Sequence, residues 1–187
     1  AYRAKGDLDH AITEFSQAIK LDPKDANILL SRALAYREKG DADHAIPDFD
    51  QALKLDPKLD DAFNGRGVAY GMRGDNDRAI ADFDRAIKID PKNAVALNNR
   101  GFAYRNKGDT ARAIADFGAA IKLDGNYALA YFNRANATYA NKDYDATLRD
   151  LDAAIKLKPD FAAAYNARGL TYDSEQDRDA AVRDFTT

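Results

Sequence analysis

Two sets of opposite charges recur along this sequence in the same register. An arginine recurs at intervals of 34 residues, at Arg32, Arg66, Arg100, Arg134 and Arg168. Carboxylates recur with the same period, at Glu14, Asp48, Asp82, Asp116, Asp150 and Asp184. A guanidinium and a carboxylate that face each other can form two parallel hydrogen bonds. The two series are consistent with an arginine ladder for an anionic ligand or with a partly buried ion pair in every period, and we favour the ion pair.

The other residues that could do chemistry lack the arrangements that chemistry needs. His10 and His44 occupy a position that holds Arg78 and Arg112 in later periods, which is typical of a solvated helix face. The chain has no cysteine, so it has neither a thiol nucleophile nor a thiolate metal site. Serine occurs at only three positions, and no Ser–His–Asp arrangement is evident. We therefore expect no enzymatic activity, no cofactor and no metal site.

The overall charge is close to balanced. The 187 residues carry 28 basic and 31 acidic side chains, a formal net charge of −3. Sequence-independent binding to nucleic acid needs a strongly basic surface, so we expect no nucleic-acid partner. The longest apolar runs, such as residues 161–165, are far too short to span a bilayer, and we expect no membrane partner. A protein or a peptide remains as the expected partner.

The two series of charged residues belong to a sequence repeat of fixed length. Three columns of identical residues show it: Tyr36, Tyr70 and Tyr104; Phe49, Phe83 and Phe117; Gly40, Gly74 and Gly108. A period of 34 residues predicts a repeat architecture, in which each unit buries its apolar face against its neighbours.

Residues 60–91 show that each unit is a helical hairpin. Apolar residues fall at helical spacing over 62–72 and again over 78–89. Between them, Gly74 suits the left-handed position that ends a helix, and Asp75 suits the N-cap of the next helix. The unit is therefore predicted to form two helices joined by a tight turn.

Some helical positions hold residues that weaken a helix. Gly65, Gly67 and Gly71 share one predicted helix, and each costs about 1 kcal/mol relative to alanine. Pro47 lies inside the helix that begins near Asp41, where we expect a kink or a cost of roughly 3 kcal/mol.

The unit resembles the tetratricopeptide repeat, a 34-residue helix–turn–helix with the pattern W-x2-L-G-x2-Y, then A-x3-F, then P. The matching residues, with Phe in place of Trp, are Phe63, Gly67, Tyr70, Ala79, Phe83 and Pro91; the next unit matches at Leu97, Gly101, Tyr104, Ala113 and Phe117. The arginine series stands where the family has leucine. The resemblance covers essentially the whole chain. It implies an all-α fold, a right-handed superhelical solenoid of antiparallel helix hairpins (an α-α superhelix).

We expect one array over residues 1–187. It comprises a partial repeat at 1–25, full repeats at 26–59, 60–93, 94–127 and 128–161, and a truncated repeat at 162–187. Tyr2 is equivalent to Tyr36, so the first helix of the first unit is incomplete. Both ends look cut, which is typical of a fragment of a longer array. Exposed apolar ends would then favour self-association through the terminal repeats.

The repeat from residue 128 is the most divergent. Thr138, Thr147 and Leu151 replace the repeated Tyr, Ala and Phe, and Lys142 replaces the glycine of the turn. The preceding unit also has Gly125 where proline is expected. We expect the geometry of this joint to differ from that of the others.

In the family that the chain resembles, the first helices line a concave groove that holds extended or helical peptides. On the face opposite the packing residues, the predicted peptide-binding residues are Asn64, Asn98, Asn99, Phe102, Arg105, Phe132, Asn133, Asn136, Tyr139 and Asn166. Asparagine can both donate to and accept from a peptide backbone, and aromatic residues are frequent binding anchors. The alternative is that these asparagines are only soluble helix surface and that Phe132 packs between repeats.

The sequence thus predicts a non-catalytic scaffold that binds a peptide or a partner protein in the groove. Two alternatives stay open. The chain could be a substrate-presenting or targeting region of a larger enzyme, or a structural array that assembles end to end.

Overall fold

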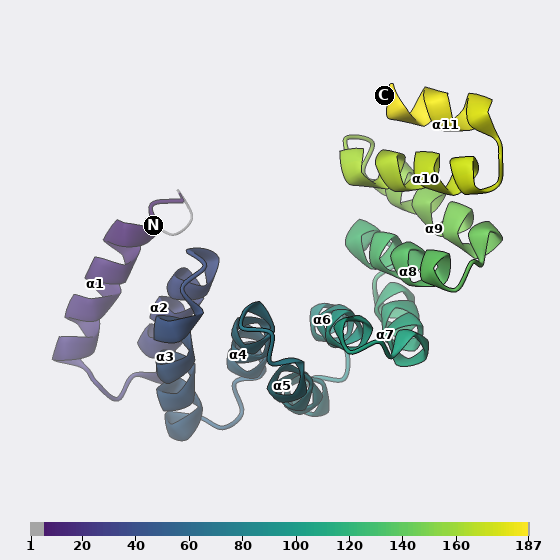
Figure 1. The fold of residues 1–187 in the computed structure, drawn as a ribbon. Coiled ribbons are helices and arrows are strands. Elements are labelled where there is room, and N and C mark those ends of the chain that lie inside the picture. The colour runs from purple at the N-terminus through teal and green to yellow at the C-terminus, as the bar shows by residue number, and fades with distance from the viewer. Residues whose placement is uncertain (1–5, 187) are drawn as a thin grey trace. The chain divides into compact units, whose positions relative to one another are not determined.

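The computed structural model describes residues 6–186, and these residues form only α-helices and the turns between them (Figure 1). The predicted all-α solenoid of helix hairpins is confirmed. Tyr2 and Thr187, at the two ends of the predicted array, lie outside the described residues.

The helices pair as first and second helices of successive hairpins. Their bounds are α1 Leu8–Leu21, α2 Ala26–Glu38, α3 Ala42–Leu55, α4 Asp60–Met72, α5 Asn76–Ile89, α6 Ala94–Asn106, α7 Thr110–Leu123, α8 Ala128–Ala140, α9 Tyr144–Leu157, α10 Ala162–Ser174 and α11 Arg178–Phe185. The even-numbered helices are the first helices. The chain forms two compact units that meet between Ala103 and Tyr104, inside α6, and each unit is described by itself below.

Where the turn inside a hairpin contains glycine, it has the predicted glycine and aspartate geometry. Gly74 adopts a φ of +77°, in the left-handed region. Asp75 caps α5 by accepting a hydrogen bond from the backbone N–H of Arg78 at 3.0 Å. Hydrogen bonds from the backbone and side chain of Arg78 lower the pKa of Asp75, which favours the charged form that caps the helix. The equivalent caps are Asp7, Asp41, Asp109, Asp143 and Asp177.

Two of these turns use a residue other than glycine. Lys142 has a φ of +60° and Gln176 a φ of +67°. Only glycine adopts this conformation without a steric cost. The turns of the hairpins α8–α9 and α10–α11 are therefore the more strained ones, as the replacement of glycine by Lys142 indicates.

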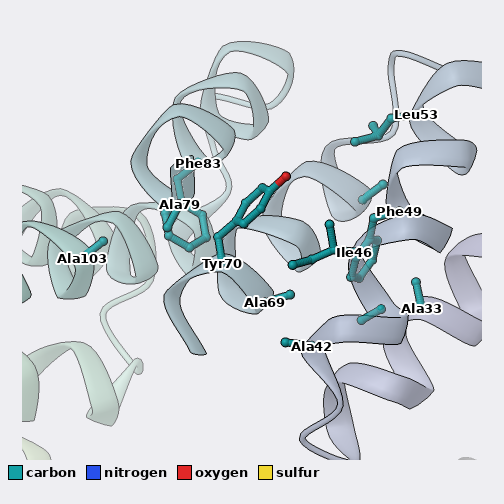
Figure 2. Close-up of a cluster of buried hydrophobic side chains, with 12 residues drawn as sticks. Ala33, Ala42, Ile46, Phe49, Leu53, Ala69, Tyr70, Ala79, Phe83 and Ala103 are labelled. Carbon is teal, nitrogen blue, oxygen red and sulfur yellow. The ribbon is translucent and has the colours of Figure 1, made fainter. Parts of the chain in front are cut away.

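The buried cluster of the first unit surrounds Tyr70. Figure 2 shows Tyr70 between Phe83 of α5 and Ile46 of α3, with Phe49 close by. Small side chains fill the remaining positions and let the backbones approach closely: Ala33, Ala42, Ala45, Ala62, Ala69, Ala79 and Ala103.

The helix that carries Pro47 continues without interruption from Ala42 to Leu55. Pro47 lies on the exposed side of α3, and its neighbours Ile46 and Asp48 are buried. A proline on the solvent side keeps its ring away from the packed face, so the apolar contacts of α3 are made despite the missing N–H.

Two of the three glycines in α4 permit close packing. A Cβ on Gly65 would lie 2.5 Å from Cζ of Phe49, and a Cβ on Gly67 would lie 2.7 Å from Cε1 of Phe83. Both rings are buried and held by their neighbours. Gly71 has no atom within 4 Å of the equivalent position. Gly65 and Gly67 therefore permit contacts that alanine would prevent, whereas Gly71 only lowers helix propensity.

We expect Gly65→Ala and Gly67→Ala to destabilise the chain. Overpacking a buried ring costs about 1–3 kcal/mol, more than the gain in helix propensity of about 1 kcal/mol. Gly71→Ala is the matched control on the same helix, and it should raise stability because only propensity changes. Thermal unfolding followed by circular dichroism measures all three variants. A shift of the melting temperature in the same direction for all three would contradict this account of the packing.

Candidate functional site

The arginine series forms ion pairs inside the hairpins. In the first unit, Nε of Arg66 donates to Oδ2 of Asp82 at 2.8 Å, and its Nη2 donates to Oδ1 of Asp82 at 2.7 Å. This bidentate contact joins α4 to α5. The Nη1 of Arg66 also donates to Oδ1 of Asp50 at 2.6 Å. One guanidinium therefore bridges its own hairpin and the second helix of the preceding hairpin.

The bidentate contact recurs at the equivalent positions. Arg32 pairs with Asp48, Arg134 with Asp150, and Arg168 with Asp184, all with N–O distances of 2.7 Å. The interpretation of the two charge series as ion pairs is confirmed for these repeats.

The second contact, to the preceding hairpin, is less regular. Arg100 donates to Asp84 and Arg168 to Asp152, each at 2.6 Å, whereas Arg32 donates to the hydroxyl of Ser16 at 3.0 Å. Gly118 stands at this position next to Arg134. Within residues 6–186 the Arg134 guanidinium accordingly hydrogen-bonds only Asp150.

These charges are already satisfied by one another. Asp82 is 5% exposed, and its hydrogen bonds raise the pKa of Arg66 above the usual value for arginine. The guanidinium also lies over the rings of Phe63 and Tyr70, at 5.6 and 5.9 Å from their centroids. A cation held by carboxylates and rings is not available to an anionic ligand, so the series is structural.

We expect Arg66→Ala to destabilise the chain by about 3–5 kcal/mol, because it leaves the carboxylate of Asp82 buried without its counter-charge. Asp50→Ala is the matched control. It removes only the outer contact, whose carboxylate is 53% exposed, and should cost less than about 1 kcal/mol. Urea unfolding measures both.

The double variant Arg66→Met, Asp82→Leu should be more stable than Arg66→Ala, since it removes both charges together. Equally small effects for Arg66→Ala and Asp50→Ala would mean that the inner pair is solvated.

Three of the predicted asparagines of the first helices are buried. Asn64 accepts a hydrogen bond at its Oδ1 from Nδ2 of Asn99, at 3.0 Å, which links α4 to α6. Asn98 is 2% exposed. In the second unit Asn133 is also buried. Amides in these places join neighbouring hairpins or pack between them, and they are less accessible to a partner than their sequence positions indicated.

Three large apolar residues on the first helices of the first unit are exposed. Phe102 is 43% exposed, and Val95 on the same helix and Met72 at the end of α4 are similarly exposed. We call the side of the first helices that carries these exposed residues and the predicted asparagines the first-helix face. In the first unit it comprises Asn64, Met72, Val95, Asn98, Asn99 and Phe102.

The predicted peptide-binding residues of the second unit differ in burial. The ring of Phe132 packs against that of Phe161, with centroids 4.9 Å apart, so the alternative that Phe132 packs between repeats is confirmed. Arg105 is half-buried, and the loss of solvent lowers the pKa of its guanidinium. Asn136 is half-buried and Asn166 is exposed. Within residues 6–186 neither of these two amides has a hydrogen-bond partner.

A pocket opens on the first-helix face of the second unit. Its volume is about 120 Å³, and its lining residues are Asn136, Tyr139, Thr147, Ala167, Leu170 and Thr171. The hydroxyl of Tyr139 and Oγ of Ser174 are 2.9 Å apart, which joins α8 to α10 beside the pocket. The first-helix face of this unit comprises Arg105, Leu129, Phe132, Asn133, Asn136, Tyr139, Asn166 and Leu170.

The sequence analysis found Asn136 and Tyr139 but missed Ala167 and Thr171. Ala167 carries no chemistry that would mark it, and Thr171 is fully buried. The available signal was the divergence at Thr147 and Leu151, which we interpreted only as altered geometry.

Other kinds of site find no support in the part of the chain that the structure describes. No group of three or more histidine, aspartate or glutamate side chains there is arranged to hold a metal ion. No described helix combines the length and the apolarity needed to cross a membrane.

The sequence matches models of known protein families. A model described as "TPR repeat" matches residues 1–40, and models described as "Tetratricopeptide repeat" match residues 30–94 and 83–115. The chain belongs to the tetratricopeptide repeat family. The TPR fold typically serves as a non-catalytic scaffold for protein interactions, and TPR proteins bind peptides or proteins. Among curated proteins, no sequence matches the chain.

Solved structures share this fold. The crystal structure of MamA is 30% identical, covers 81% of this chain and 88% of its own, and has a TM-score of 0.73. That of PilW, a widely conserved type IV pilus biogenesis factor, is 21% identical, covers 98% and 85%, and has a TM-score of 0.90. YrrB, reported as a TPR protein with an unusual peptide-binding site, is 22% identical, covers 91% and 88%, and has a TM-score of 0.70.

Proposed function

We propose that the first-helix face of each unit binds an extended segment of a partner protein. The observation that carries the proposal is the gathering of exposed large apolar side chains there: Met72, Val95 and Phe102 in the first unit, and Leu129, Tyr139 and Leu170 in the second. Exposed apolar side chains that gather on one face are typical of interaction sites.

The second helices that lie between the terminal helices α1 and α11 expose fewer such residues, whereas α1 exposes Leu21 and α11 exposes Val182 and Phe185. Each of α3, α5, α7 and α9 has one exposed large apolar residue, at its last position: Leu55, Ile89, Leu123 and Leu157. Their remaining large apolar side chains pack against the first helices. Between α2 and α10 the first helices thus expose more large apolar residues than the second helices, which is why we place the partner on them.

Polar groups for the partner backbone lie beside the apolar residues. Asn136 and Asn166 have no partner among the described residues, and an asparagine amide can donate to a carbonyl and accept from an N–H. Each such hydrogen bond contributes about 1 kcal/mol or less, because it replaces bonds to water. Affinity would therefore come chiefly from the apolar anchors, and the amides would set the register of the segment.

The hydrogen bond between Asn64 and Asn99 holds the helices that carry the first-helix face of the first unit. The bond between Asn99 and Asn64 fixes α6 against α4, so the exposed Phe102 and Val95 stand on a braced helix. Side chains that are held before a partner arrives lose less entropy on binding. We therefore assign Asn64 and Asn99 to the support of the site, and Phe102 to contact with the partner.

A peptide selected from a phage-displayed library against this chain tests the proposal. For a peptide bound to the first unit we expect Phe102→Ala, and for one bound to the second unit Leu170→Ala, to weaken binding at least about tenfold, or about 1.4 kcal/mol, as expected for the loss of an anchor. Fluorescence anisotropy with the labelled peptide measures Kd.

The matched controls are Leu123→Ala and Leu157→Ala, at second-helix ends with exposures of 44% and 38%, compared with 43% for Phe102 and 48% for Leu170. They should leave Kd unchanged. Weakening by the controls alone would place the site on the second helices, and failure to select any binding peptide would contradict the proposal as a whole.

A further inference from the structure

We propose that the pocket between α8, α9 and α10 binds one branched aliphatic side chain, leucine or isoleucine, of the partner segment, while Asn136 hydrogen-bonds the backbone of that residue. This inference rests on the proposed function and names the side chain that the second unit recognises.

The first step is the origin of the pocket. In the first unit the ring of Phe49 reaches Gly65 and would lie 2.5 Å from a Cβ there. The equivalent residues of the second unit are Leu151 and Ala167, which share one apolar cluster. Leucine is shorter than phenylalanine and has no ring to reach across to α10. We attribute the space beside Ala167 to this replacement.

The second step is the chemistry of the walls. The hydroxyl of Thr171 donates to the carbonyl of Ala167 at 2.8 Å. That of Thr147 lies 2.8 Å from the carbonyl of Asp143 and 3.0 Å from the hydroxyl of Thr138. With their hydroxyls engaged, both threonines can offer their methyl groups to an occupant. Together with Ala167 and Leu170, they make a largely apolar lining.

The third step is size. The cavity of about 120 Å³ corresponds to about four groups the size of a water molecule, at roughly 30 Å³ each. The side chains of leucine and isoleucine contain four carbon atoms. Alanine would leave most of the space empty, and the ring of phenylalanine would exceed it. The volume therefore favours a branched aliphatic side chain.

The fourth step is the polar edge. The amide of Asn136 lines the pocket, is half-buried and has no partner among the described residues. The ring of Tyr139 forms the adjacent wall, fixed by its bond to Ser174 and by contact with the ring of Tyr144 at 5.6 Å between centroids. A residue whose side chain enters the pocket would bring its backbone next to the amide.

The test uses three probes, the N-acetyl methylamides of leucine, alanine and phenylalanine, titrated into the ¹⁵N-labelled chain. We expect the leucine probe to shift the backbone amides of Asn136, Ala167 and Leu170 saturably. Its binding should be at least about tenfold tighter than that of the other two, since methylene differences in a fitted apolar pocket give discrimination of this order. Intermolecular nuclear Overhauser effects should connect the leucine methyls to the methyl of Thr171.

Ala167→Leu fills the pocket and should abolish these shifts. The matched control, Ala163→Leu, makes the same change at an exposed position of the same helix and should preserve them. If Ala167→Leu does not fold, the Overhauser contacts of the unaltered chain still decide the location. Equal binding of the leucine and alanine probes, or contacts outside the pocket, would overturn the inference.

The two proposals fail separately. Selected peptides that depend on Leu170 but bind equally well to the Ala167→Leu variant would leave the proposed function in place and overturn the pocket. Loss of binding on filling the pocket supports both.

Discussion

A bidentate pair between arginine and a buried aspartate joins the two helices of the hairpins α2–α3, α4–α5, α8–α9 and α10–α11. The guanidinium fills a position on the first helix where a leucine would pack, and its carboxylate partner comes from the second helix. Such a pair is directional, so it fixes the rotation of one helix about the other as well as their separation. Because the arginines face inward, the opposite side of the first helices carries the amides that link neighbouring helices and the exposed apolar residues. The exposed apolar residues of the first-helix face depend on that rotation.

Much of the fold could be predicted from the sequence, because its determinants are local and repeated. The Gly-Asp turns, the helix bounds near 60–72 and 76–89 and the ion pairs all follow from residues that recur with one period. The second contact of each guanidinium was not anticipated. It joins Arg66 to Asp50 in the preceding hairpin, and the sequence pattern alone does not say which surface charges of adjacent repeats meet. The sequence did not predict that Gly65 and Gly67 permit the close approach of aromatic rings. Such an approach is a tertiary contact, which a repeat pattern does not specify.

The candidate site was harder to predict because helical periodicity gives the direction of a side chain and not its partners. Asn64 and Asn99 point to the expected side but bond one another, and Phe132 points there but packs on Phe161. Asn136 and Asn166 share the same residue type and stay unbonded. We attribute the pocket beside Ala167 to Leu151, which replaces the larger phenylalanine of the other repeats. In the sequence, such a cavity is visible only as a change of residue at a repeated position.

Hydrogen–deuterium exchange of the chain, with and without a selected peptide, tests the central claim most directly. Inward arginine pairs leave the first helices as the contact surface. The account therefore predicts that a peptide bound to the second unit slows exchange in α8 and α10, and that one bound to the first unit slows exchange in α4 and in residues 94–103 of α6. Exchange in α5, α7 and α9 should change little. Slowed exchange confined to the second helices would contradict the account, because it would place the partner on the opposite face of every hairpin.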